Sequence, residues 1–146
     1  MASAATPPDT ALRTAREAVV ARHVEAELQG DAAGVVATFK VPRYDLVASG
    51  DLLEGAEAVA RRVDELAAAM PGVALEIVAL HHADEAVIVE TRTRGIHRAP
   101  LLGVPPTGRH YETRGVAIFR FDGADLIEEV VYWDRLGLLE QLRQKG

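Results

Sequence analysis

Cysteine is absent from the 146-residue chain. Its absence excludes disulfides, thiolate nucleophiles and cysteine-based zinc sites, and it is typical of a reducing compartment. No apolar run approaches the roughly 20 residues of a membrane-spanning helix, and residues 1–9 lack the basic start and apolar stretch of a secretory signal. We therefore expect a cytoplasmic protein with no membrane partner and with a disordered leader over residues 1–9.

Positive charge is scarce as well. Lysine and arginine number 16 against 22 aspartates and glutamates, which gives a formal net charge of −6, and the basic residues form no long run. This charge has the wrong sign for binding a phosphate backbone, so we expect no nucleic-acid partner. The hydrophobic fraction of 49% is ordinary for a globular protein, and the length suits a single domain, placed over residues 10–146.

Helical periodicity dominates the first half of the chain. Apolar residues recur at helical spacing over residues 10–28, where Thr10 could cap the helix, and Asp31 can cap a second, shorter helix. A short strand is predicted over residues 44–49. The clearest apolar stripe covers residues 56–70 and ends at a Pro-Gly pair, which predicts a third helix.

The period changes to two in the second half. Alternating and β-branched runs joined by turn residues predict two hairpins, with strands over residues 73–80, 86–97, 111–121 and 126–133. A proline-rich loop over residues 98–108 connects the hairpins, and a helix follows the last strand. This order predicts an α+β fold in which helices pack under a curved antiparallel sheet around an apolar pocket. The last strand carries apolar residues at both odd and even positions, so both of its faces should be covered. We therefore expect a homodimer through the sheet.

Three motifs resemble those of one known family. They are Gly95-Ile-His97, the loop Gly103-Val-Pro-Pro-Thr-Gly108, and the terminal Tyr132-Trp-Asp134 with Leu138-Leu139-Glu-Gln141-Leu142. The region of residues 31–142 is similar to the SnoaL-like polyketide cyclase, or ester cyclase, family, although Arg143 stands where that family usually has glycine. The resemblance implies the cone-shaped fold of nuclear transport factor 2-like proteins. That superfamily contains cyclases, isomerases, dehydratases, hydrolases and non-catalytic binders, so function follows only by analogy.

Asp134 is the first catalytic candidate. If it shares the parity of Val130 and Tyr132, its carboxylate faces an apolar interior, where burial raises the pKa of a carboxyl group. Such a group can exchange protons with a carbon next to a carbonyl near neutral pH. The family resemblance implies the same role, an acid/base aspartate that drives intramolecular aldol closure without a cofactor. The alternative is an ordinary N-cap, since Asp134 stands between a strand and a helix.

His97 is the second catalytic candidate. It ends a strand beside the proline-rich loop, where its ring could bind a substrate carbonyl or orient Asp134, or could simply be a polar rim residue. His23, on the apolar stripe of the first helix, is interpreted as a satisfied core histidine. Predicted substrate-binding walls, for which core packing is the alternative, are Tyr132, Tyr44, Phe119, Leu101 and Val130.

Two charged patterns are given structural interpretations. His81-His82-Ala-Asp84 is interpreted as a solvated turn, because neighbouring strand residues point to opposite faces and cannot share a metal ion. Glu90, Arg92 and Arg94 alternate on one strand face, and with Asp134 they resemble the site of limonene-type epoxide hydrolases. Strand alternation argues against that site. If His97 points inward, the even-numbered residues Glu90, Arg92 and Arg94 point outward. No metal or cofactor is expected.

The leading hypothesis is a cofactor-independent, cyclase-like lyase or isomerase that acts on a small hydrophobic carbonyl compound such as a polyketide. The alternatives are a non-catalytic small-molecule-binding protein and a limonene-type epoxide hydrolase.

Overall fold

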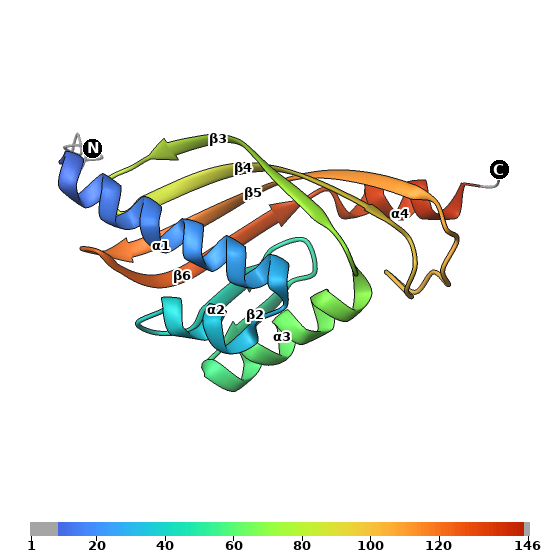
Figure 1. Cartoon of the computed structure of the whole chain (residues 1–146), viewed down its shortest axis with the longest axis horizontal. Helices are drawn as coiled ribbons and strands as arrows, with labels where there is room; N and C mark the ends of the chain where they lie inside the picture. The colour runs from blue at the N-terminus through green and yellow to red at the C-terminus, as the bar shows by residue number, and fades with distance from the viewer. Residues whose placement is uncertain (1–8, 145–146) are drawn as a thin grey trace.

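The computed structural model describes residues 9–144 and has the predicted α+β architecture. Helices α1, α2 and α3 lie on one side of a curved six-stranded sheet, and α4 lies at its far end (Figure 1). The elements are α1 Thr10–Gln29, α2 Ala32–Thr38, β1 Arg43–Leu46, β2 Asp51–Glu54, α3 Ala56–Ala69, β3 Ala74–His82, β4 Ala86–Ile96, β5 His110–Asp122, β6 Asp125–Trp133 and α4 Arg135–Arg143. Of the predicted leader, only Asp9 falls among the described residues.

The sheet has the strand order β2-β1-β6-β5-β4-β3. Every neighbouring pair is antiparallel except β1 and β6, which run parallel, so the sheet is mixed rather than purely antiparallel as predicted. Strand β2 was not predicted, since its four residues are mostly exposed and show no apolar alternation.

The ends of α1 and α2 follow from local hydrogen bonding. Asp9, rather than the predicted Thr10, caps α1 by accepting a hydrogen bond from the Leu12 amide at 2.8 Å. Gly30 ends α1 in the left-handed conformation, with φ of 66°, which glycine adopts without strain. Asp31 caps α2 as predicted, through the Gly34 amide at 2.9 Å.

A bulge in the last hairpin decides which residues of β6 face the helices. Phe121 pairs with Leu126, whereas Arg120 pairs with Glu128, so Ile127 is an extra residue. One inserted residue moves every later side chain to the opposite face of the sheet. Leu126 and Glu129 therefore lie on the helix side. The predicted inward orientation of Val130 and Tyr132 is wrong.

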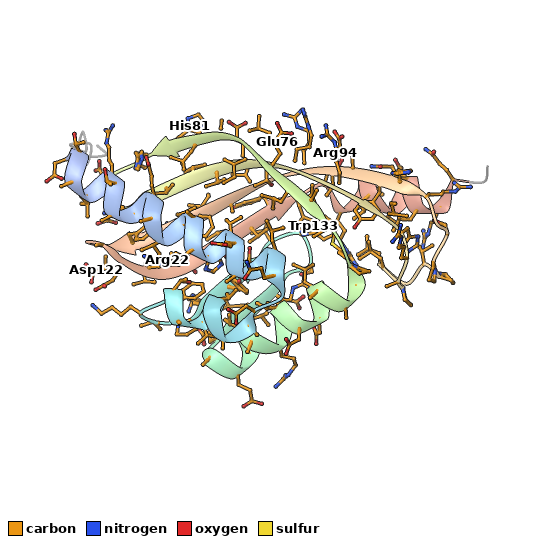
Figure 2. The ribbon with its side chains drawn as sticks, viewed as in Figure 1. Arg22, Glu76, His81, Arg94, Asp122 and Trp133 are labelled. Carbon is orange, nitrogen blue, oxygen red and sulfur yellow. The ribbon has the colours of Figure 1, made fainter. Side chains whose placement is uncertain are left out.

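The side chains of β4 alternate between the two faces of the sheet as predicted. Val87 and Val89 are buried in the core, while Glu90 and Arg92 occupy the other face. Arg92 is held by ion pairs with Glu76 and Glu112 at 3.7 and 3.4 Å. Figure 2 shows neighbouring Glu76 and Arg94 on the side of the β3–β4 hairpin that faces away from the helices. Glu90, but not Arg92, borders a cavity of the outer face that Asp134 also lines, and the epoxide hydrolase alternative stays a prediction.

Arg16 connects α1 to two hairpin turns through hydrogen bonds. Its side chain is buried, and its Nε donates to the Gly123 carbonyl at 2.8 Å while Nη1 donates to the Asp84 carbonyl at 2.8 Å. The guanidinium also lies over the Phe121 ring, 5.3 Å from its centroid. Among the described residues, no helix is both long enough and apolar enough to cross a membrane.

Candidate active site

His23 lies at the centre of the main core. Together with Arg16, Val20 and Ala26 it belongs to the face of α1 that is buried against the sheet. Its side chain is fully buried, and Glu129 on β6, directly opposite, has a side chain that is only 4% exposed. Two ionisable residues thus meet inside an otherwise apolar core, where charges are stable only when they are paired.

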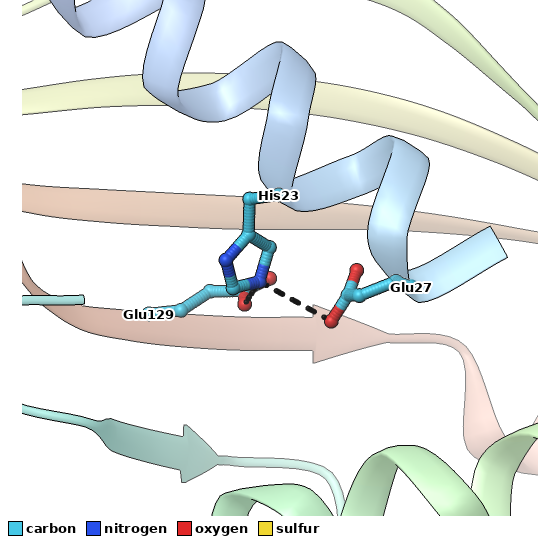
Figure 3. A group of neighbouring side chains, drawn as sticks. All are labelled: His23, Glu27 and Glu129. Carbon is cyan, nitrogen blue, oxygen red and sulfur yellow. Dashed lines mark ion pairs between the residues drawn. The ribbon is translucent and has the colours of Figure 1, made fainter. Parts of the chain in front are cut away.

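Three polar groups converge on the Nε2 side of His23, and Figure 3 shows the two carboxylates among them. Nε2 lies 2.8 Å from Oε2 of Glu129 and 3.4 Å from Oε1 of Glu27, one helical turn further along α1. The Tyr44 hydroxyl donates to the same Glu27 oxygen at 2.6 Å and lies 3.2 Å from Nε2. We call His23, Glu27, Glu129 and Tyr44 the His23 cluster.

The opposite side of the ring favours a hydrogen on Nδ1 of His23. The Thr38 hydroxyl donates its hydrogen to the Val35 carbonyl at 2.6 Å, so its contact with Nδ1 at 2.7 Å requires an N–H on the ring. Nε2 faces carboxylates, which when ionised only accept hydrogen bonds. With ionised carboxylates at Nε2 and a hydrogen on Nδ1 the ring is an imidazolium, which agrees with the raised pKa of His23.

Aromatic rings complete the surroundings of the imidazolium. Phe39, Phe119 and Tyr44 meet the His23 ring nearly at right angles, with centroids 5.2, 5.3 and 6.1 Å away. Such packing excludes water, and it strengthens the electrostatic interactions within the His23 cluster by lowering the local dielectric.

Burial and pairing separate the pKa values of the two carboxyl groups. Burial first, and then repulsion from Glu27, raises the pKa of Glu129 to about 7. Burial would also raise the pKa of Glu27, but its hydrogen bond to His23 lowers that pKa below the usual range. Burial opposes the charge on His23, yet the attraction of Glu129 and Glu27 raises the His23 pKa to about 10. Burial likewise raises the pKa of Tyr44, which keeps its hydroxyl a hydrogen-bond donor.

The His23 cluster fits a shared proton better than a metal ion. One ligand atom from each of His23, Glu27 and Glu129 lies within 4.8 Å of the others, which is close enough to consider a metal site. Two ligand atoms on a tetrahedral zinc ion would lie about 3.4 Å apart, given bonds of about 2.1 Å. The 2.8 Å between Nε2 and Oε2 of Glu129 is shorter than this and suits a direct ion pair.

Comparison with protein-family models shows which family this chain belongs to. The model for SnoaL-like polyketide cyclases matches residues 17–142. The chain belongs to the SnoaL-like polyketide cyclase family. Membership supports a cyclase-type function for this family member. Comparison with curated proteins found no match.

Solved structures show the same fold. A SnoaL-like protein from Jannaschia sp. CCS1 superposes with a TM-score of 0.84 at 20% identity, over 97% of this chain and 100% of that one. A candidate polyketide cyclase from Acidithiobacillus ferrooxidans gives 0.73 at 26% identity, over 90% and 96%. A nuclear transport factor 2-like protein from Burkholderia thailandensis E264 gives 0.68 at 24% identity, over 87% and 95%. The fold implied by the sequence motifs is therefore confirmed.

Asp134 of this SnoaL-like chain is not buried in an apolar interior, contrary to expectation. Its side chain is exposed and caps α4 by accepting a hydrogen bond from the Gly137 amide at 2.9 Å, which is the alternative interpretation of the sequence. It also lines a surface cavity of about 440 Å³ together with Tyr132, Trp133 and Arg114. Its catalytic role stays a prediction.

His97 is buried but does not lie beside Asp134. Its Nδ1 contacts the Thr107 hydroxyl at 2.9 Å, which ties the strand end to the proline-rich loop. Thr113, bonded to the Asp134 carbonyl, pairs with Thr93, four residues before His97. Four residues of strand span about 13 Å, so His97 does not orient Asp134. His97 lines neither the 440 Å³ cavity nor a second one of about 470 Å³ that Tyr111 and Arg94 border.

The predicted pocket walls divide into three groups. Tyr44 and Phe119 lie against His23. Leu101 packs in a separate cluster with Tyr111 and residues of α4. Val130 and Tyr132 occupy the opposite face of the sheet, where Tyr132 is 46% exposed.

Sequence reasoning missed Glu27, Glu129 and Thr38. Two signals were present. Glu27 follows His23 by four residues and therefore lies on the same helix face, and Glu129 interrupts an otherwise apolar strand. His23 was correctly interpreted as buried and satisfied, but its partners are carboxylates rather than the neutral groups of an ordinary core.

Proposed function

We propose that this protein is a cofactor-independent, cyclase-type enzyme in which Glu129 is the acid/base residue, acting on a small hydrophobic carbonyl compound such as a polyketide. The observation that supports this most is the burial of Glu129 against the His23 imidazolium, with a pKa raised to about 7. A carboxyl group with this pKa exchanges protons efficiently at neutral pH. Carboxyl groups with separated pKa values in a shared site are typical of acid/base catalysis.

The reaction is an intramolecular aldol closure. Glu129 takes a proton from the carbon next to one carbonyl, and the resulting enolate is stabilised by hydrogen-bond donation from Nε2 of His23. The enolate carbon forms a bond to a second carbonyl carbon of the same molecule. Glu129 then returns its proton to the alkoxide oxygen, so the step is balanced without an external reactant.

Glu27 and Tyr44 adjust the proton affinity of this pair. Glu27 remains ionised and helps keep His23 positively charged, while repulsion between the carboxylates makes Glu129 a stronger base. The Glu27 side chain is 24% exposed, in contrast to 4% for Glu129. Glu27 is thus the more accessible of the two carboxyl groups, and we expect the substrate to reach the His23 cluster from its side.

The test is proton exchange at carbon, which needs no knowledge of the natural substrate. We expect the protein in D2O to exchange the α-hydrogens of 1-tetralone, followed by NMR, faster than buffer alone. Glu129→Gln should lower the protein-dependent rate by about 100-fold or more, the usual contribution of a general base.

Glu128→Gln is the matched control. Glu128 is the preceding residue on the opposite face, where it pairs with Arg43 and Arg120, so this variant should exchange within about twofold of the wild type. A rate equal to buffer for the wild-type protein would reject the proposal and leave the non-catalytic binding protein. Loss of exchange in folded Asp134→Asn, with Glu129→Gln unaffected, would return the acid/base role to Asp134.

A further inference from the structure

Thr38 is the last residue of α2, and its hydroxyl contacts Nδ1 of the His23 ring. Its hydroxyl has a single hydrogen, which goes to the Val35 carbonyl at 2.6 Å in its own helix. The hydroxyl oxygen can therefore only accept from Nδ1, 2.7 Å away. The contact therefore favours a hydrogen on Nδ1.

The position of Thr38 relative to Glu129 is held by the chain that follows it. Phe39 packs edge-on against His23, with centroids 5.2 Å apart, and forms a bridge with Leu126 at the start of β6. The Lys40 amide donates to the Leu126 carbonyl at 2.8 Å. The end of α2 is thus fastened to the strand that carries Glu129, and the ring of His23 is held between the two.

We infer that Thr38 is a positioning residue, which keeps hydrogen on Nδ1 of His23 so that the ring stays cationic and presents an N–H to Glu129. The inference rests on the proposed function, because only a proton-transferring Glu129 makes the charge state of His23 matter for turnover. A second hydrogen-bond partner that fixes the orientation and tautomer of a histidine is a common supporting element of functional sites.

The other groups that face the ring explain why Thr38 matters. Glu27 on α1, Glu129 on β6 and Tyr44 on β1 all contact the Nε2 side, and Arg62 on α3 acts on Glu27 through its charge. Within residues 9–144, Thr38 is the hydrogen-bond partner of Nδ1. Without its oxygen a buried N–H lacks an acceptor, which favours the neutral ring and deprives Glu129 of its counter-ion.

Thr38→Val removes the hydroxyl at nearly constant volume. We expect the acidic limb of the pH profile of tetralone exchange to move up by about one unit. From a Glu129 pKa of about 7, such a shift lowers the ionised fraction at pH 7.5 from about three quarters to about one quarter, so exchange at that pH should fall by about threefold. The ¹⁵N spectrum of the His23 ring should lose its imidazolium signature at a lower pH than in the wild type. Thr38→Ser, which keeps the hydroxyl, should restore both the profile and the spectrum.

Thr14→Val is the matched control, because Thr14 makes the same type of helix contact, to the Thr10 carbonyl at 2.9 Å, on the exposed side of α1. It should change neither readout. A Thr38→Val protein with a wild-type profile and spectrum would overturn the inference, as would failure of Thr38→Ser to restore them. If the spectrum responds while Glu129→Gln leaves exchange unchanged, Thr38 positions His23 but the proposed function is wrong.

Discussion

Replacement of His23 by glutamine tests the energetics of the buried ion pairs. Glutamine keeps a polar side chain of similar size but cannot be charged. The His23 pKa of about 10 lies above the unfolded value of about 6.5, so its charge stabilises the folded state fully below pH 6.5, and the stabilisation disappears as the pH rises through 10. At 1.36 kcal/mol per pKa unit, the loss should be about 4 kcal/mol at pH 7 and about 1.4 kcal/mol at pH 9.

Urea unfolding followed by fluorescence of Trp133, the single tryptophan, measures this difference at both pH values. The value at pH 7 falls within the range of about 3–5 kcal/mol for breaking a buried ion pair. His81→Gln is the control, since His81 is 56% exposed and pairs with Glu90 at the surface, where we expect less than about 1 kcal/mol. An equal loss at pH 7 and pH 9 for His23→Gln would refute a charged, paired His23.

Further expected outcomes concern activity, stability and assembly. The exchange rate should follow a bell-shaped pH profile, rising near pH 7 as Glu129 ionises and falling near pH 10 as His23 loses its proton; a flat profile between pH 5 and 8 would contradict this. Arg16→Met should cost about 2–4 kcal/mol in urea unfolding without changing exchange, because two carbonyls lose a charged donor. Asp134→Ala should cost about 1 kcal/mol and Asp134→Asn less, as for any N-cap, so a larger loss with asparagine would contradict the capping role. If the chain forms the expected homodimer through the outer sheet face, Tyr132→Arg should halve the mass measured by light scattering, whereas a wild-type monomer would reject it.

The helices and hairpins were predictable because each has a strong local signal. The apolar stripe of residues 56–70 and the Pro-Gly pair after it define α3, and the turn at residues 122–125 defines the last hairpin. The four-residue β2 gives no such signal, because it is held by pairing with β1 and not by apolar alternation.

The candidate site was less predictable because its geometry depends on the bulge at Ile127. Without the bulge, Val130 and Tyr132 would face the helices, which is how the sequence was interpreted. Glu129 would then face away from them. Alternation assumes regular pairing, so a one-residue insertion that no local motif marks reverses the assignment. The spacing of His23 and Glu27 was visible, but their meeting with Glu129 required the tertiary structure.

The central claim is that Glu129 is a proton-transfer group with a pKa far above that of an ordinary glutamate. The most direct measurement is a ¹³C NMR titration of the Glu129 side-chain carboxyl, assigned with Glu129→Gln. We expect a midpoint near pH 7 that is displaced in Thr38→Val and His23→Gln. A midpoint near 4.5 in the folded wild-type protein would contradict it.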